Sequence, residues 1–335
     1  MLNLLICSTG GKNRNFPEYI YKNYKVNEDN TLIVEVDNYP NPLKIIKIIS
    51  RLKNYEFDKI YSIGGGSVID VSKVLSVFLP LKLDAKISDL ENYEKYADID
   101  KKLFLAAIPT TCGTGAEVTQ FATIWDKSNN KKYSIDHPNM IPTEYLLDGS
   151  LLETLPYNNF LYPALDCVSH TLESIWNKNR TEKSLEYSEK SLNILQNEIN
   201  NFHESNYKKV NFNDMLLASN FAGKAINLTR TSIAHSISYK YTLDYSVPHG
   251  LACSFTLPKL HEFVKNSLKD EIYNKFCEPI DLIIDNLINM NLNSQLEHFT
   301  DGNKVLFSSE TIHLSRSTTF LAEVTPSFIN EKIIS

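Results

Sequence analysis

The order of apolar and polar positions divides the 335-residue chain into two parts. Up to about residue 150, short apolar runs alternate with segments whose apolar residues recur every three or four positions. Such alternation of strand-like and helix-like pieces is typical of a parallel, doubly wound sheet. The expected strands are 4–8, 31–36, 59–63 and 103–108, and the expected helices between them are 16–21, 43–52 and 68–78.

Beyond residue 156 the pattern becomes almost wholly helical. Apolar residues spaced by three and four predict helices over 165–175, 182–199, 213–227 and 257–268. The tail from residue 294 is rich in Ser, Thr and Asn, and we expect a short helix or loop there. Because the chain is long for a single core, we predict two domains: an α/β domain over 1–150 and an all-α domain over 151–335.

The composition of the chain argues against several classes of function. The formal net charge of −6 argues against nucleic-acid binding, which requires a basic face. No apolar run reaches the length of a membrane span, and the apolar start lacks the basic flank of a signal peptide. Five widely spaced cysteines without a CxxC pair suggest reduced thiols. We therefore expect a cytoplasmic globular protein with no nucleic-acid or membrane partner.

Two loops at predicted strand ends have the composition of a nucleotide site. The first, Gly64-Gly65-Gly66-Ser67, opens a helix, where bare backbone and N-terminal amides favour a pyrophosphate. The second contains Thr110, Thr111 and Thr114 among glycines. In open parallel sheets, ligands bind at these carboxyl ends of the strands. The alternatives are a tight turn for the first loop and an N-capped helix start for the second.

A third pattern predicts a metal site. Asp166 and His170 are four residues apart, which places both side chains on one face of a helix. His235 and His249 could complete a set of one carboxylate and three imidazoles, which suits Fe(II) or Zn(II). The alternative is that these are ordinary buried polar residues with protein partners.

Together, these motifs resemble those of the iron-containing (group III) alcohol dehydrogenases. Residues 64–73, GGGSVIDVSK, resemble the family's GGGSxxDxxK signature, and residues 109–119 resemble its PTTxGTGSEVT loop. Asp166 and His170 match the family's DxxxH metal pair. His235 precedes His249 by the family's spacing of fourteen residues. The resemblance covers roughly residues 34–260.

The resemblance implies a Rossmann-like N-terminal domain and a helical C-terminal domain, with the active site in the cleft between them. Dehydroquinate synthases share this plan, but the motifs are those of the dehydrogenases. The implied reaction is reversible hydride transfer between a nicotinamide cofactor and an alcohol/aldehyde pair. A metal on Asp166, His170, His235 and His249 would polarise the carbonyl oxygen. Fe(II) is favoured over Zn(II), and the family suggests a homodimer.

The resemblance also assigns cofactor residues. It implies a nicotinamide dinucleotide on the glycine loop and on the threonine loop. Lys132 resembles the family's lysine near the cofactor, with a surface lysine of a β-hairpin as the alternative. Asp37 resembles the acidic residue that binds the adenosine ribose, which favours NAD(H) over NADP(H) because a carboxylate repels a 2′-phosphate. The full predicted set is Asp37, Gly64, Gly65, Gly66, Ser67, Asp70, Thr110, Thr111, Thr114 and Lys132.

Departures from the family pattern bear on the substrate. Tyr239 occupies a position where many members have another histidine, and we expect it either to relay a proton or to line the pocket. Residues 172–179 and 229–239 are similar to members that reduce phosphonoacetaldehyde to 2-hydroxyethylphosphonate. Arg230 would bind the phosphonate, because a guanidinium donates two parallel hydrogen bonds, or else forms a structural ion pair.

Two other functions remain open at this point. The first is a general short-chain alcohol, diol or lactaldehyde dehydrogenase. The second is an inactive relic that binds nucleotide or metal without turnover, which a short C-terminal region and Tyr239 suggest. The intact set of four candidate ligands argues against the relic.

Overall fold

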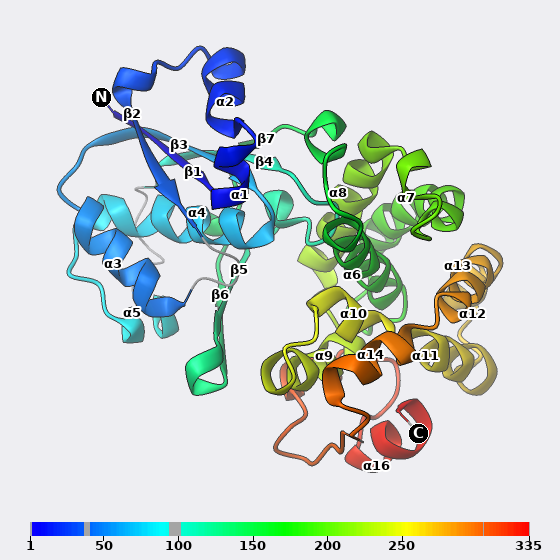
Figure 1. The fold of residues 1–335 in the computed structure, drawn as a ribbon. Helices are drawn as coiled ribbons and strands as arrows, with labels where there is room; N and C mark the ends of the chain where they lie inside the picture. The colour runs from blue at the N-terminus through cyan, green and yellow to red at the C-terminus, as the bar shows by residue number, and fades with distance from the viewer. Residues whose placement is uncertain (1, 37–40, 94–101, 304, 335) are drawn as a thin grey trace. The chain divides into compact units, whose positions relative to one another are not determined.

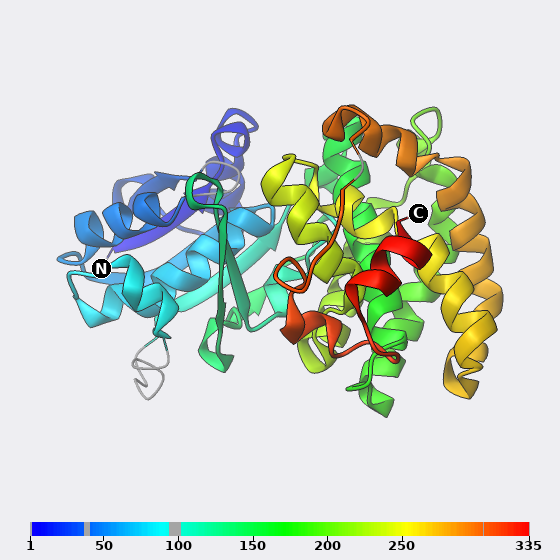
Figure 2. The same ribbon diagram turned by 90° about the horizontal axis from the view of Figure 1, so that it is seen from below.

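The computed structural model describes residues 2–36, 41–93, 102–303 and 305–334. It divides into two compact units. Unit 1 comprises residues 1–111 and 116–148, and unit 2 comprises residues 112–115 and 149–335. Each unit has its own layers of secondary structure, which Figures 1 and 2 show from two directions.

Unit 1 is built on a five-stranded parallel sheet with the strand order β2-β1-β3-β4-β7. The strands are β1 (Leu2–Cys7), β2 (Thr31–Glu35), β3 (Phe57–Gly64), β4 (Phe104–Pro109) and β7 (Glu144–Tyr145). The middle strands are largely apolar and mostly buried, with Leu4 of β1 opposite Leu32 of β2 and Ile60 of β3. Buried parallel strands of this kind read as continuous apolar runs.

The helices of unit 1 are α1 (Thr9–Asn13), α2 (Phe16–Tyr24), α3 (Pro42–Leu52), α4 (Gly66–Phe78) and α5 (Ile87–Glu91). Almost all side chains of α4 are buried, because it packs against the sheet and against a separate antiparallel hairpin. The hairpin strands are β5 (Phe121–Asp126) and β6 (Lys131–Asp136), and Figure 2 shows them as a long two-stranded ribbon.

Unit 2 is helical and is organised around α6 (Tyr157–Ile175), which contacts α7, α8, α9 and α10. Its other helices are α7 (Glu182–Glu198), α8 (Phe212–Thr229), α9 (Ile233–Asp244), α10 (His249–Ser254), α11 (Leu257–Phe263), α12 (Glu271–Asn274), α13 (Cys277–Asn289), α14 (Leu292–Thr300), α15 (Leu314–Ser317) and α16 (Pro326–Phe328). The C-terminal segment packs on α11, with Phe263 and Phe328 rings 4.8 Å apart.

The predicted fold class is confirmed: a parallel α/β unit is followed by a helical one. Some element bounds differ from the predictions. α6 begins eight residues earlier than predicted and contains Pro163 in its second turn. The predicted helix 257–268 keeps α geometry only to Phe263 and continues as a π-helical turn over Val264–Leu268. In the described ranges, no helix combines the length and apolar character needed to cross a bilayer.

Candidate active site

The four predicted metal ligands converge within unit 2. Asp166 and His170 lie one turn apart on α6, with the His170 Nε2 atom 3.5 Å from the Asp166 Oδ1 atom. His235 on α9 places its Nε2 atom 3.4 Å from the same oxygen, and His249, the first residue of α10, places its Nε2 atom 4.0 Å from it. The His170 and His235 rings stack with centroids 4.8 Å apart.

The geometry fits a divalent cation. Around a tetrahedral metal with bonds of about 2.0–2.1 Å, neighbouring ligand atoms lie about 3.3 Å apart, close to these separations. Asp166 and His235 are buried, and neither Asp166 Oδ1 nor His235 Nε2 has a hydrogen-bond partner of good geometry within the described part of the chain. Buried polar atoms are normally paired, so two such atoms aimed at each other mark a place for an ion.

A fifth side chain, Cys253, also reaches this cluster and was not predicted from the sequence. The ligand atoms of Asp166, His235, His249 and Cys253 all lie within 4.8 Å of one another, and His170 is not part of that mutually close group. His170 is instead close to the Asp166 oxygen and stacked on His235. The structure thus brings five candidate donors together rather than four.

The Glu173 carboxylate contacts the ring of the candidate ligand His235. This fully buried carboxylate, one turn beyond His170 on α6, lies 2.6 Å from the His235 Nδ1 atom. It also accepts hydrogen bonds from the backbone N–H groups of Ser232 and His235. A carboxylate that holds Nδ1–H leaves Nε2 free as a metal ligand. The sequence offered a signal for it, because Glu173 follows Asp166 by seven residues and His170 by three on one helix face.

The electrostatics of the cluster favour a positive charge there. Burial alone would raise the pKa of Asp166, but the imidazoles of His170, His235 and His249 lower it below its ordinary value. Burial lowers the pKa of His170. Burial also opposes a charge on His235, but Cys253 and Glu173 carry the pKa of His235 well above its ordinary value. Two carboxylates in a buried pocket therefore suit a bound cation.

Close packing between α6 and α10 sets the position of His249. A Cβ atom on Gly250 would lie 1.7 Å from the Tyr162 carbonyl oxygen, so only glycine lets the two helices approach this closely. The Ser254 hydroxyl donates to the Leu165 carbonyl oxygen at 2.8 Å and lies 2.9 Å from the Ser169 hydroxyl. These contacts fix both ends of the short helix that begins with the fourth predicted ligand.

Tyr239 lies beside the most exposed of the four predicted ligands. The His249 side chain is 21% exposed, whereas those of Asp166, His170 and His235 are almost fully covered. The Tyr239 ring is nearly parallel to that of His249, with centroids 6.5 Å apart. The Tyr239 ring also meets the exposed His313 edge-on, with centroids 5.1 Å apart. His313 was missed because nothing in the sequence around it resembles a motif.

Arg230 lies at the junction of α8 and α9, shortly before His235. It caps α8 in an unusual backbone conformation with φ of 70° and ψ of 167°, which a non-glycine residue adopts only at a cost. Its carbonyl oxygen accepts a hydrogen bond from the Asn177 side chain at 3.1 Å. Asn179 likewise donates to the Thr229 carbonyl oxygen. The two sequence stretches that suggested a phosphonate substrate, 172–179 and 229–239, are therefore packed together.

In unit 1, the glycine loop lies where β3 ends and α4 begins. Gly64 is the last residue of β3, Gly65 is the N-cap of α4, and Gly66 and Ser67 form its first turn. The Thr110 N–H donates to the Gly64 carbonyl oxygen at 3.0 Å. A Cβ atom on Gly65 would lie 3.3 Å from the Thr111 hydroxyl oxygen. The structure thus places two threonines beside a helix N-terminus that favours a phosphate.

Asp70 and Lys73 have partners inside unit 1. The fully buried Lys73 ammonium donates to the Phe121 carbonyl oxygen and the Thr119 hydroxyl, and it lies 3.3 Å from the Asp70 carboxylate. Asp70 also accepts from the Thr123 N–H at 2.9 Å. Lys132, on β6, lies over the Trp125 ring. Asp70 and Lys73 therefore tie α4 to the hairpin strand that carries Trp125.

Two further predicted cofactor residues are Thr114 and Asp37. Thr114 belongs to the segment Cys112–Gly115, which is part of unit 2. There Gly115 has a φ of 58°, and a Cβ atom on it would lie 2.5 Å from the Gly223 Cα atom. Asp37 lies outside the described residues.

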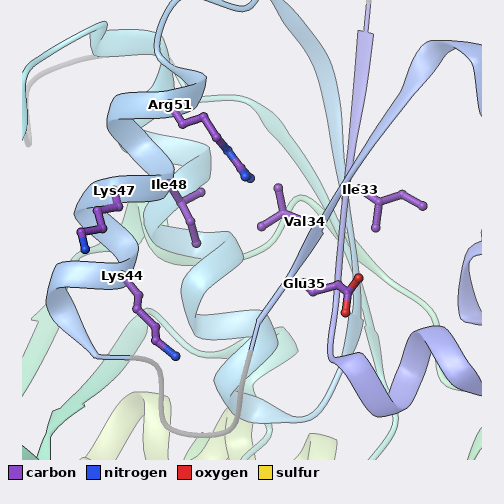
Figure 3. Close-up of a pocket in the computed structure, with 7 residues that line it drawn as sticks. All are labelled: Ile33, Val34, Glu35, Lys44, Lys47, Ile48 and Arg51. Carbon is purple, nitrogen blue, oxygen red and sulfur yellow. The ribbon is translucent and has the colours of Figure 1, made fainter.

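A basic groove borders β2 in unit 1. It has a volume of about 410 Å³ and lies between β2 and α3 (Figure 3). Its lining residues are Ile33, Val34, Glu35, Lys44, Lys47, Ile48 and Arg51. The Glu35 carboxylate pairs with Lys12 at 2.8 Å. No sequence motif marks this groove, because the spacing of its three cations is that of any exposed helix face.

The chain belongs to the iron-containing alcohol dehydrogenase family. The family profile for iron-containing alcohol dehydrogenase matches residues 3–149, and the profile for the C-terminal part of Fe-containing alcohol dehydrogenases matches residues 160–303. A solved iron-containing alcohol dehydrogenase from Thermotoga maritima superposes with a TM-score of 0.79 at 25% identity, covering 98% of this chain and 90% of that one. Both findings confirm the resemblance that the motifs predicted.

Several characterised relatives are similar over part of their length. Phosphonoacetaldehyde reductase from Streptomyces viridochromogenes is 28% identical over 235 residues, which are 69% of this chain and 59% of that protein. A 4-hydroxybutyrate dehydrogenase from Clostridium kluyveri is 30% identical over 217 residues, 64% of this chain and 56% of that protein. The NADPH-dependent butanol dehydrogenase of Clostridium saccharobutylicum is 27% identical over 267 residues, 77% of this chain and 68% of that protein.

Proposed function

We propose that this protein is a metal-dependent, NAD(P)H-linked reductase that converts an aldehyde to a primary alcohol. One observation carries the proposal: Asp166, His170, His235 and His249 converge, and Asp166 Oδ1 and His235 Nε2 are buried atoms without a hydrogen-bond partner of good geometry in the described chain. A relic under no selection has no reason to retain such a costly buried arrangement. Membership in a dehydrogenase family adds support.

The proposal gives each residue a role. When bound, the metal supplies Lewis-acid polarisation of the substrate oxygen. Asp166 and the three histidines hold it, and Glu173 keeps the His235 Nε2 atom free to bind. Tyr239 lines the more exposed side of the cluster, where its hydroxyl would donate a proton to the oxygen of the reduced substrate and take one back from solvent. The amides at the start of α4, with Thr110 and Thr111, bind the cofactor pyrophosphate.

We propose phosphonoacetaldehyde, reduced to 2-hydroxyethylphosphonate, as the substrate. One relative is named for phosphonoacetaldehyde and another for 4-hydroxybutyrate, and both compounds carry an anionic group at the end of a short chain. Arg230, directly before the segment that leads to His235, is our candidate for binding that anion. The alternative is a general short-chain alcohol dehydrogenase, which similarity to a butanol dehydrogenase supports.

We propose Fe(II) as the metal, with Zn(II) as the alternative. We also propose that the protein is a homodimer in the cytoplasm. NAD(H) is the proposed cofactor because Asp37 would repel a 2′-phosphate. The basic groove offers a reason for the opposite preference, since Lys44 and Lys47 lie on the helix that follows Asp37 in the chain. Comparing kcat/KM with NADH and NADPH decides between the two.

The test is a substrate screen with purified protein loaded with Fe(II) or Zn(II). We expect oxidation of NADH with phosphonoacetaldehyde, and a kcat/KM at least about tenfold above that for butyraldehyde or lactaldehyde, which corresponds to about 1.4 kcal/mol. A preference for the neutral aldehydes would reject the phosphonate substrate. Stoichiometric metal without turnover of any aldehyde would favour the relic.

Arg230→Ala provides a sharper test of substrate recognition. A hydrogen bond to a charged group is worth about 1.5–3 kcal/mol, so we expect KM for phosphonoacetaldehyde to rise about 10- to 100-fold with little change for neutral aldehydes. Arg230→Lys retains the charge but not the two parallel donors, so its KM for phosphonoacetaldehyde should lie between those of the wild type and Arg230→Ala. Equal losses on charged and neutral aldehydes would mean that Arg230 only shapes the junction of α8 and α9.

A further inference from the structure

Cys253 lies in the metal cluster rather than in the apolar core. It is fully buried and follows His249 by four residues on α10, so both side chains share one helix face. Its Sγ atom is 3.7 Å from the His249 Nε2 atom and 3.8 Å from Nδ1. It also lies within 4.8 Å of the ligand atoms of Asp166 and His235. A buried free cysteine ordinarily packs as a small hydrophobe, which this setting does not provide.

The separations suit a metal with both sulfur and nitrogen ligands. Bonds of about 2.3 Å to sulfur and about 2.05 Å to nitrogen, at a tetrahedral angle, place the two atoms about 3.6 Å apart. The distance from Cys253 Sγ to His249 Nε2 is 3.7 Å. The buried Asp166 Oδ1 and His235 Nε2 atoms, which point to a ligand independently of the thiol, belong to the same group. The His170 Nε2 atom, also on α6, lies 3.5 Å from the same Asp166 Oδ1 atom.

We propose that Cys253 is an additional ligand of the metal, so that the centre has a sulfur donor beside its carboxylate and imidazoles. This inference rests on the proposed metal-dependent function. Asp166, His235 and His249 form the shared base of the site, to which His170 adds a nitrogen and Cys253 a sulfur. Binding forms a sulfur–metal bond, and the thiol proton leaves to the solvent. Because thiolate is a soft ligand, the centre should favour Zn(II) more than a set of only nitrogen and oxygen does.

X-ray absorption spectroscopy of the zinc-loaded wild-type protein tests the proposal without any substitution. We expect a sulfur shell at about 2.3 Å in addition to nitrogen and oxygen at about 2.0–2.2 Å. A first shell made only of nitrogen and oxygen would overturn the role of Cys253 and leave the proposed function intact. Failure of the wild-type protein to bind any divalent metal would overturn both, so the two failures can be told apart.

Cobalt substitution provides a second readout. Co(II) bound to a thiolate shows a sulfur-to-cobalt charge-transfer band in the near ultraviolet. We expect this band in wild-type protein and in Cys277→Ser, whose thiol is on α13 near Tyr273 and Asn274, and its loss in Cys253→Ser. Circular dichroism shows whether Cys253→Ser is folded, and Cys253→Ala serves if it is not. A band that persists in both Cys253 variants would refute the proposal.

Discussion

At the scale of single residues, the site depends on a carboxylate that does not itself face the metal position. Glu173 has no exposed surface and satisfies three donors at once: the His235 ring, the His235 N–H and the Ser232 N–H. These bonds orient His235 and fix the backbone at the start of α9. A single side chain on α6 thus orients a candidate ligand on another helix.

Glu173→Gln should weaken metal binding. The amide keeps the size of the side chain but loses the charge that supports Nδ1–H, and loss of such a supporting partner typically costs about 10- to 100-fold in metal affinity. Competition with a chromogenic chelator measures the change. Glu186→Gln, an exposed position on α7 that pairs only with surface lysines among its described contacts, is the control and should bind metal as wild type does. Equal affinities for both variants would contradict this role of Glu173.

The candidate metal ligands were easier to predict from the sequence than the residues that surround them. Asp166, His170, His235 and His249 could be predicted as candidate ligands because helical spacing and a family motif depend only on order along the chain, and the structure brings their side chains together. Cys253 and His313 were missed because their proximity to the cluster and to Tyr239 depends on which segments fold together. Spacing along the chain also does not show which hydrogen-bond partners a side chain has. Asp70 is a predicted cofactor residue, and its carboxylate accepts a hydrogen bond from the Thr123 N–H and lies beside the Lys73 ammonium.

At the scale of elements, the contact between α6 and α10 decides whether the fourth histidine reaches the site. Gly250 allows α10 to press against the backbone of α6 at Tyr162, and Ser254 bonds to Leu165 one turn further along. α10 has only six residues, too few to be stable by itself, so its position comes from these contacts.

Gly250→Ala should separate the two helices. The new methyl group would meet the Tyr162 carbonyl oxygen, and relief of that overlap moves His249 and Cys253 together. Overpacking of this kind costs about 1–3 kcal/mol, so we expect a lower melting temperature and at least about tenfold weaker metal binding. Gly10→Ala is the matched control, because nothing lies closer than 4.0 Å to its new Cβ atom. If both variants bind metal equally well, the packing argument is wrong.

Element types were predictable where periodicity was strong. The parallel strands and the long helices α4, α7 and α8 follow their apolar patterns closely. The strands β5 and β6 were not predicted as strands, and a β-hairpin entered only as the alternative setting of Lys132. The start of α6 was placed too late, and the π-helical turn after Phe263 could not be distinguished from a helix, because side-chain spacing hardly changes at such a turn.

At the scale of the whole molecule, the two proposed functions are divided between the compact units. The candidate metal residues all lie in unit 2, whereas Gly64 to Ser67 and Thr110 and Thr111 lie in unit 1. A ligand that binds the native state stabilises the part of the structure that holds it. The two units should therefore respond differently to metal and to cofactor.

Hydrogen exchange measured by mass spectrometry can detect this division. Adding zinc to metal-depleted protein should slow exchange in α6, α9 and α10, and leave the first turn of α4 unchanged. Adding NADH without metal should slow exchange at the start of α4 and in the strand end that leads to Thr110. Uniform protection by either ligand would contradict separate binding surfaces. The Glu173→Gln variant should lose the zinc response while keeping the NADH response.

The two-unit plan was visible as a change of apolar pattern near residue 150, but the short insertion Cys112–Gly115 was not. Gly113 and Gly115 meet the backbone at Pro163 and Gly223, on α6 and α8. The polypeptide consequently passes from one unit to the other three times. Anyone grafting residues 1–148 of a relative onto this protein would also replace four residues of the recipient's helical core, so a working chimera needs a donor whose loop suits those two helices.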